Sequence, residues 1–242
     1  MGIMQRYFPE EMAVKLAEMA NADVFVETGT CSGKTAKWAA GKFKTVHTIE
    51  LSEELFCHSE KELLSMGNVT PYFGDSREIL PKILAATRGN IVFWLDAHYS
   101  AGTTAGKEDP CPLLMELEMI LKRTNGDIIL IDDARCANGT EGWPTISELY
   151  ETIIKCSAIP RFMLICDDNI YIIPDEDEFK KALFEYSMQR SVELWERVKQ
   201  EENKKNRLQR MAKKVGASFL KTIGIYDVTR KMYRRIKRNE LL

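Results

Sequence analysis

One segment, Val24–Ala40, constrains the fold of this chain more than any other. It opens with Val24–Glu27, a short apolar run that ends in an acid and is typical of a buried strand. A turn containing Gly29 and Gly33 follows, and then a helix-forming run. This order is how α/β proteins direct backbone N–H groups and a helix N-terminus at a ligand. Glycine lets the chain turn and lets the backbone approach a neighbour closely, so the segment predicts an α/β fold with a ligand at this turn.

Three interpretations of the turn compete. A phosphate loop needs four residues between its first glycine and a Gly-Lys-Ser/Thr triplet, but only three separate Gly29 from Gly33-Lys34-Thr35. A site for S-adenosylmethionine expects an acid at the strand end, where Glu27 stands. A carboxylate there repels a triphosphate but attracts a sulfonium and an ammonium group. The third interpretation is a tight turn without a ligand. We favour the S-adenosylmethionine site.

The remainder of the chain up to about residue 175 alternates between apolar strands and helical runs. This alternation predicts a doubly wound, Rossmann-like, mostly parallel sheet. A last pair of strands separated only by a short turn predicts a terminal antiparallel hairpin. Strands are expected at 45–50, 69–73, 91–96, 127–132, 161–167 and 169–174, and helices at 9–20, 53–66, 78–87, 113–122 and 145–156.

Composition excludes several classes of protein. The 242 residues are 45% hydrophobic and 29% charged, which is ordinary for a soluble globular chain. No apolar run reaches the length of a membrane span. Six cysteines are scattered without a CxxC pair, which argues against a disulfide framework or a zinc site. We therefore expect reduced thiols and a cytoplasmic location.

Charge is distributed unevenly. Residues 1–188 carry 18 basic and 30 acidic residues, a net charge of −12, whereas residues 189–242 carry 16 and 6, a net charge of +10. The chain is thus an acidic body with a basic tail. We predict a ligand-binding domain over 1–178 and a basic helical extension over 179–242, in which 179–211 has helical propensity and a thin apolar stripe.

The segment 221–238 mixes apolar and basic residues at helical spacing. Three interpretations stay open for it. It packs on the acidic body or on the second subunit of a homodimer, it contacts an anionic membrane surface, or it contacts nucleic acid. Nucleic acid is the least favoured of the three, because no aromatic stacking platform accompanies the charge.

Acids end five of the predicted strands, and ligands of doubly wound sheets lie at that edge. Glu50 lies 23 residues after Glu27, the position at which such folds bind a ribose diol. Asp75 and Ser76 follow the next strand, within reach of an adenine edge. The plain alternative for each single acid is a turn or helix N-cap residue.

Three further carboxylates, Asp96, Asp132 and Asp133, follow strands that we expect to be neighbours. Converging carboxylates repel each other unless a cation or protons offset them. Hard oxygen ligands favour Mg²⁺ or Ca²⁺ over zinc. The alternative is that Asp133 faces solvent and Asp132 caps the following turn.

These motifs together resemble one family. The segments in question are Val26-Glu-Thr-Gly-Thr-Cys-Ser-Gly-Lys-Thr-Ala, Thr48-Ile-Glu50, Gly74-Asp-Ser, Val92-Phe-Trp-Leu-Asp96 and Ile129-Leu-Ile-Asp-Asp133. They are similar to class I S-adenosylmethionine-dependent methyltransferases, and closest to the metal-dependent catechol and caffeoyl-CoA O-methyltransferase branch. The resemblance covers about residues 20–175 and leaves the tail outside.

The resemblance implies a seven-stranded sheet whose last strand is antiparallel, and it assigns roles to single residues. Glu50 would hold the ribose, Asp75 and Ser76 would lie near the adenine, and Asp96, Asp132 and Asp133 match the family's metal positions. Asp133 stands where the family usually has Asn. The residues expected around the rest of the cofactor are Glu27, Gly29, Thr30, Gly33, Thr35 and Asp96.

The general base departs from the family pattern. The branch usually has a Lys three residues after the first metal Asp, where this chain has Tyr99. His98 is the better base at neutral pH, because its unperturbed pKa is about 6.5. The candidate catalytic residues are therefore His98, Tyr99 and Asp96, with 101–112 and 136–144 shaping the acceptor pocket.

We expect methyl transfer by in-line displacement to a hydroxyl of a small molecule or glycan, with Mg²⁺ assistance implied by the family. Two alternatives stay open: an ATP-using enzyme similar to P-loop proteins, and a nonenzymatic nucleoside-binding or scaffold protein that acts through its basic tail.

Overall fold

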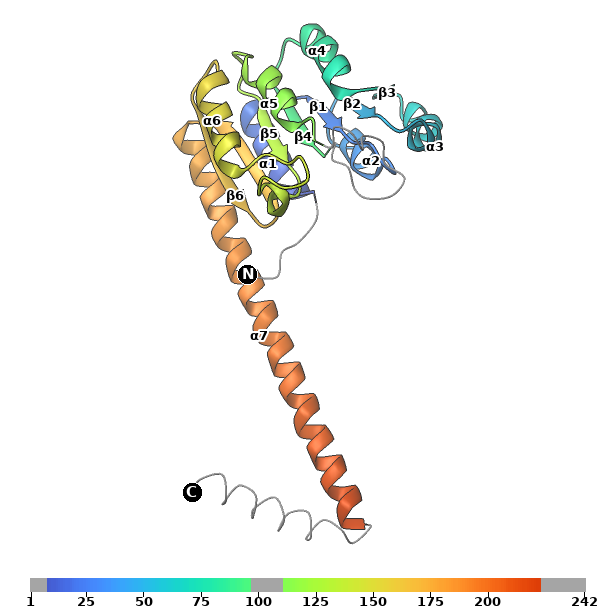
Figure 1. The fold of residues 1–242 in the computed structure, drawn as a ribbon, viewed down its shortest axis with the longest axis vertical. Coiled ribbons are helices and arrows are strands. Elements are labelled where there is room, and N and C mark those ends of the chain that lie inside the picture. The colour runs from blue at the N-terminus through green and yellow to red at the C-terminus, as the bar shows by residue number, and fades with distance from the viewer. Residues whose placement is uncertain (1–7, 97–110, 223–242) are drawn as a thin grey trace. The chain divides into compact units, whose positions relative to one another are not determined.

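The computed structural model describes residues 8–96 and 111–222, and strands and helices alternate along them (Figure 1). The predicted α/β class is confirmed. In chain order the elements are α1 (Glu10–Ala20), β1 (Val24–Thr28), α2 (Lys34–Ala40), β2 (Thr45–Glu50), α3 (Glu53–Leu64), β3 (Val69–Phe73), α4 (Ser76–Ala86), β4 (Ile91–Leu95), α5 (Leu113–Leu121), β5 (Ile128–Ile131), η1 (Ala134–Cys136), α6 (Ile146–Cys156), β6 (Arg161–Cys166), β7 (Asn169–Pro174) and α7 (Asp177–Thr222).

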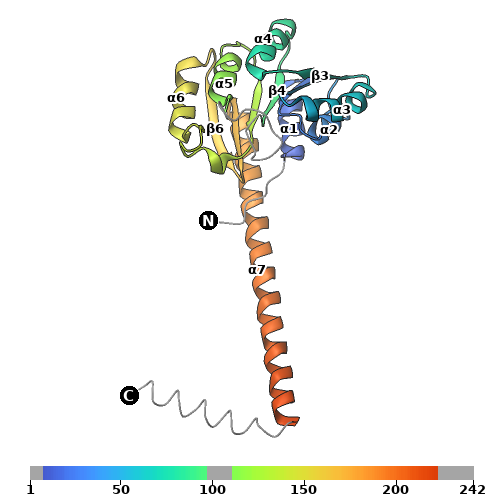
Figure 2. The same cartoon turned by 45° about the vertical axis from the view of Figure 1, so that its right-hand side comes forward.

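The strands form one seven-stranded sheet in the order β3-β2-β1-β4-β5-β7-β6. The pairs from β3 to β5 are parallel, and β7 is antiparallel to both β5 and β6. The β6–β7 pair is the predicted terminal hairpin. In Figure 2, β3 and β6 lie at opposite sides of the sheet. The predicted Rossmann-like, mostly parallel architecture is therefore confirmed.

Helices cover both faces of the sheet, which explains why the central strands are apolar throughout. Successive side chains of β4 point to opposite faces, so Val92 and Trp94 join one core while Phe93 and Leu95 join the other. The first core includes residues of α1, α2, α3 and the start of α7. The second includes residues of α4, α5 and α6.

Two element boundaries differ from the sequence prediction for identifiable reasons. Helix α4 begins at Ser76 rather than at residue 78, because the Asp75 side chain accepts the backbone N–H of Arg77 and caps the helix. Helix α3 ends at Leu64 rather than at residue 66, and Gly67 follows with a φ of +79°.

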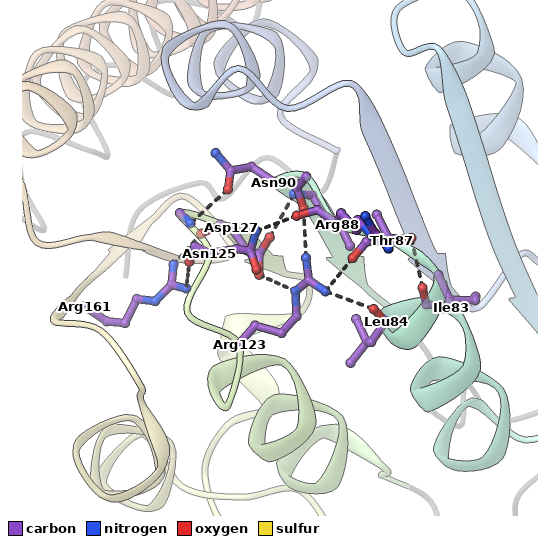
Figure 3. Close-up of polar contacts among 12 residues, drawn as sticks. Ile83, Leu84, Thr87, Arg88, Asn90, Arg123, Asn125, Asp127 and Arg161 are labelled. Carbon is purple, nitrogen blue, oxygen red and sulfur yellow. Dashed lines mark hydrogen bonds and ion pairs between the residues drawn. The ribbon is translucent and has the colours of Figure 1, made fainter.

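A polar cluster ties together the loops at the end of the sheet opposite the strand-end acids (Figure 3). Buried Asp127 accepts the backbone N–H of Ile91 at 2.9 Å and Nε of Arg123 at 2.8 Å. The Arg123 guanidinium also donates to carbonyls of residues 84, 87 and 89. Arg161 donates to the carbonyls of Asp127 and Asn125. One buried carboxylate and two arginines thus connect α4, α5 and β6.

The chain divides into two compact units, residues 1–188 and 189–242. Phe179 and Leu183, in the first turns of α7, are buried in the first core, so this part of the helix belongs to the first unit. This division does not test the predicted domain boundary after residue 178.

In the second unit, Trp195 is 60% exposed and the ammonium of Lys199 lies 5.0 Å from its ring centroid. Among the described residues, no helix combines the length and apolarity that crossing a membrane requires.

Candidate functional site

The site is built where the strand order reverses. The chain runs from β1 outward to β2 and β3 and then returns to the other side of β1 as β4. Parallel strands that diverge in this way leave a crevice at their carboxyl ends, where ligands of such folds bind. Glu27 and Thr28 end β1, and Asp96 follows β4. The predicted strand-end acids of β1 and β4 therefore lie at the carboxyl edge of the sheet where the strand order reverses.

The glycine turn after β1 has the backbone geometry that its sequence requires. Gly29 and Gly33 have φ values of +89° and +69°, which residues other than glycine rarely adopt. A Cβ on Gly33 would also lie 3.3 Å from the Leu63 side chain. The N–H groups of Gly29 and Thr30 both donate to the carbonyl of Ile49, so the turn is held against β2.

Glu27 is a buried carboxyl group at the base of this turn. Its Oε2 accepts the Thr48 hydroxyl at 2.6 Å, and the hydroxyls of Thr30 and Thr48 are 2.5 Å apart. Burial raises the pKa of Glu27 to about 8, and repulsion from Glu50 adds to this, whereas hydrogen bonds from Thr48 and Thr35 lower it. A cationic ligand beside Glu27 would favour the ionised form.

Glu50 links the turn to the end of β2. Its Oε2 accepts the backbone N–H of Cys31 at 2.8 Å, and its Oε1 accepts that of Ser52 at 2.8 Å. Each carboxylate oxygen retains a second lone pair for a ligand hydroxyl. The structure thus places Glu50 beside the predicted cofactor turn, while its binding role stays a prediction.

Asp75 has partners within the chain. It caps α4 and forms an ion pair with Arg77, with 2.6 Å between Nη2 and Oδ2. The hydrogen bond from Arg77 holds the pKa of Asp75 below its usual range. The N-cap interpretation left open by the sequence therefore describes Asp75 in this structure, and its contact with an adenine stays a prediction.

A buried acid that the sequence analysis did not single out, Glu116 on α5, lies beside Ser76. It is 1% exposed; the Thr28 hydroxyl donates to its Oε2 at 3.5 Å, and its Oε1 has no hydrogen-bond partner among the described residues. Burial raises the pKa of Glu116 to about 7. The sequence does contain a signal for the burial of Glu116. Helical spacing places it on the same buried face as Leu113 and Ile120.

Asp96 and Asp132 follow two paired strands, since Leu95 is opposite Ile131 in the sheet. Burial raises the pKa of Asp96 to about 9, with further contributions from the charges of Asp132, Glu27 and Asp133. Burial also raises the pKa of Asp132 to about 6. Ionising one of these carboxyl groups makes ionisation of its neighbours less favourable, and a positively charged ligand at this edge of the sheet would favour their ionised forms.

The third predicted metal ligand, Asp133, is engaged elsewhere. Its Oδ1 lies 2.5 Å from Nη1 of Arg135, and the same guanidinium pairs with buried Asp168. Within the described ranges 8–96 and 111–222, no group of three or more His, Cys, Asp or Glu side chains is arranged to hold a metal ion. The donor set as described therefore does not fit a three-carboxylate Mg²⁺ site.

The predicted catalytic residues His98 and Tyr99 lie outside the described residues, as does most of the predicted acceptor loop 101–112. In the second predicted acceptor segment, 136–144, Trp143 is partly buried against the second core. An isolated bridge between Asn138 and Thr145 closes this segment.

Comparisons with known proteins give structural matches only. No protein-family model matches the chain, and no curated protein matches its sequence. Among solved structures, the O-methyltransferase TomG of Streptomyces achromogenes, which is involved in tomaymycin synthesis and was solved with S-adenosylmethionine, is 16% identical. It matches 69% of this chain and 79% of its own, with a TM-score of 0.52. An O-methyltransferase of Bacillus cereus solved with S-adenosylhomocysteine is 18% identical over 70% of this chain and 82% of its own, also with a TM-score of 0.52.

At this level of identity the similarity shows a shared fold. The chain has the seven-stranded Rossmann-like fold of these methyltransferases, and the resemblance predicted from the strand-end motifs is confirmed at the level of architecture.

Proposed function

We propose that this chain is an S-adenosylmethionine-dependent methyltransferase that methylates a hydroxyl of a small molecule or sugar. One observation carries the proposal: the buried acids Glu27 and Glu50 lie at the carboxyl ends of adjacent parallel strands, and the glycine turn that follows Glu27 donates the Cys31 N–H to Glu50. The shared fold with two solved O-methyltransferases supports it.

Each acid has a chemical role in this proposal. Glu27 would pair with the cationic methionine part of the cofactor, because burial disfavours the ionised carboxylate and a cation beside it would offset that effect. Glu50 accepts hydrogen bonds from the ribose hydroxyls with its remaining lone pairs. Thr48 and Thr30 orient Glu27 through their hydroxyls.

Methyl transfer then needs alignment and deprotonation of the acceptor. The sulfonium carbon is already electrophilic, so the main task is to hold the acceptor oxygen in line with the sulfur–carbon bond. His98 is the candidate base, since its ordinary pKa suits proton transfer near neutral pH. Tyr99 and Asp96 are the other candidates for this step.

The family resemblance implies Mg²⁺ at Asp96, Asp132 and Asp133. The ion pair between Asp133 and Arg135 argues against these three residues as a set of metal ligands.

Calorimetry with S-adenosylhomocysteine and with ATP tests the cofactor. We expect binding of the first, and Glu50→Gln should weaken it by about 10- to 100-fold, since a charge-assisted hydrogen bond contributes about 1.5–3 kcal/mol. Glu53→Gln is the matched control, because Glu53 is an exposed acid three residues away in sequence. Thermal melts of both variants verify that the turn remains folded.

Other results would select the rival functions. Binding of ATP in place of S-adenosylhomocysteine would indicate an ATP-using enzyme. Binding without transfer of a labelled methyl group to any catechol, sugar or glycan acceptor would favour a nonenzymatic binding protein. Unchanged affinity in Glu50→Gln would contradict the role of Glu50.

A further inference from the structure

The carboxylate of Asp133 is held by a cation that belongs to the chain. Nη1 of Arg135 lies 2.5 Å from Asp133 Oδ1 and also pairs with Oδ2 of Asp168, whose side chain is fully buried. The backbone N–H of Arg135 donates to the other oxygen of Asp168 at 3.0 Å. Ala134 N–H donates to the Asp168 carbonyl at 2.8 Å. Arg135 is therefore fixed by both its backbone and its guanidinium.

The backbone conformation after β5 directs the consecutive acids Asp132 and Asp133 differently. Asp133 has a φ of +55°, in the left-handed region, and the chain turns there into η1, which carries Arg135. Asp133 N–H donates to Asp132 Oδ1 at 2.8 Å. Oδ1 of Asp133 forms the ion pair with Nη1 of Arg135. The second of the two acids is thus paired with a cation of the chain itself.

A guanidinium shared between two carboxylates is a specific arrangement. The planar fork of arginine matches carboxylate geometry and remains charged at any pH at which the protein is folded. Arg135 is also only partly exposed, with 29% of its side chain accessible, so solvent screens the pair incompletely. A divalent ion bound by Asp133 would share this carboxylate with the guanidinium, and the two cations would repel each other.

We propose that Arg135 is the resident cation of this edge of the sheet, and that the chain binds its cofactor and transfers the methyl group without a divalent cation. The methyl-transfer part rests on the proposed function. The metal part stands by itself, because it concerns only the ion pairs of Arg135, Asp133 and Asp168. Arg135 acts as a positioning residue that keeps Asp133 away from any metal.

Titration of the full chain with Mn²⁺, followed by the electron paramagnetic resonance signal of the free ion, tests the metal part. We expect the wild type to leave Mn²⁺ free into the millimolar range. Arg135→Met should release Asp133 and tighten Mn²⁺ binding by about tenfold or more. Arg135→Lys, which keeps a cation at this position, is the matched control and should gain no binding.

Asp133→Ala, which removes the side-chain oxygens at this position, keeps the proposal testable if Arg135→Met does not fold. We expect its affinity for S-adenosylhomocysteine and its turnover in EDTA to equal those of the wild type. Mn²⁺ binding by the wild type that disappears in Asp133→Ala would overturn the proposal. Turnover that EDTA abolishes and Mg²⁺ restores would overturn it as well. The manganese titration decides the role of Arg135 whether or not the chain binds the cofactor.

Discussion

Glu116 shows how burial of a single carboxyl group couples stability to pH. In the folded chain its pKa is raised to about 7, whereas an unfolded chain keeps the ordinary value of 4.5. Below pH 4.5 both states are protonated and the group has no pH-dependent effect. Between 4.5 and 7 only the unfolded state ionises, so this group lowers stability progressively as pH rises.

We therefore predict that Glu116→Gln gains stability relative to the wild type on going from pH 5 to pH 8. The gain should be roughly 2–4 kcal/mol, because each pKa unit corresponds to about 1.4 kcal/mol. Urea denaturation at the two pH values measures it. Glu118→Gln, at an exposed position of the same helix, should show no such change. Equal pH dependence in the wild type and in Glu116→Gln would show that Glu116 is not the titrating group.

Individual residues were predictable where local sequence determines their position. Glu27 and Glu50 follow apolar strands, so the alternation of strands and helices alone places them at one edge of the sheet. Glu116 and the contact between Arg135 and Asp168 were not found, because the partners are distant in sequence. Thr28 lies 88 positions from Glu116, and Asp168 lies 33 positions from Arg135. Only the folded sheet brings these pairs together.

At the scale of elements, the loops opposite the candidate site depend on the pair between Arg123 and Asp127. Asp127 is fully buried and the Arg123 side chain is 11% exposed, so removal of one partner leaves a poorly solvated charge. We predict that Asp127→Ala lowers the free energy of unfolding by about 3–5 kcal/mol. Urea denaturation measures this loss. Affinity for S-adenosylhomocysteine should be unchanged below the transition, because Asp127 and Ile91 lie at the amino ends of β5 and β4, whereas the candidate site follows the carboxyl ends of the strands.

The exposed pair of Glu151 and Lys155 on α6 provides the control for this experiment. Its two side chains are 62% and 70% exposed, so Glu151→Ala should cost no more than about 1 kcal/mol. Similar losses for the two substitutions would mean that burial of the Arg123–Asp127 pair contributes little.

Elements themselves were predicted more reliably than their ends. Strands buried on both faces read as continuous apolar runs. Strand β3 contains Pro71 and is an edge strand of the sheet, the position at which a proline is tolerated. Ends depend on side-chain contacts that a pattern does not contain, such as the capping of α4 by Asp75. The 46 residues of α7 form one helix, longer than the segment predicted from its thin apolar stripe.

At the scale of the whole molecule, the opposite charges of residues 1–188 and 189–242 raise the question of what the basic unit contacts. Sequence alone leaves three answers open, because charge and helical spacing do not distinguish a protein partner, an anionic membrane and nucleic acid. We propose the protein partner, either the acidic body or a second copy of the chain. A net charge of −12 on residues 1–188 is itself an electrostatic complement to +10.

Flotation with liposomes and light scattering decide between these partners. We predict that the full chain stays unbound to vesicles containing phosphatidylserine at physiological salt, and that a version ending at Met188 loses a dimer or loses solubility. Salt should weaken the interaction, because exposed charges are screened over about 8 Å at physiological ionic strength.

Flotation of the full chain but not of the shortened one would instead establish a membrane contact, since each basic residue near anionic lipid contributes about 1 kcal/mol. A parallel titration with single-stranded RNA should show no binding by either version, and salt-sensitive binding by the full chain alone would replace the protein partner with nucleic acid.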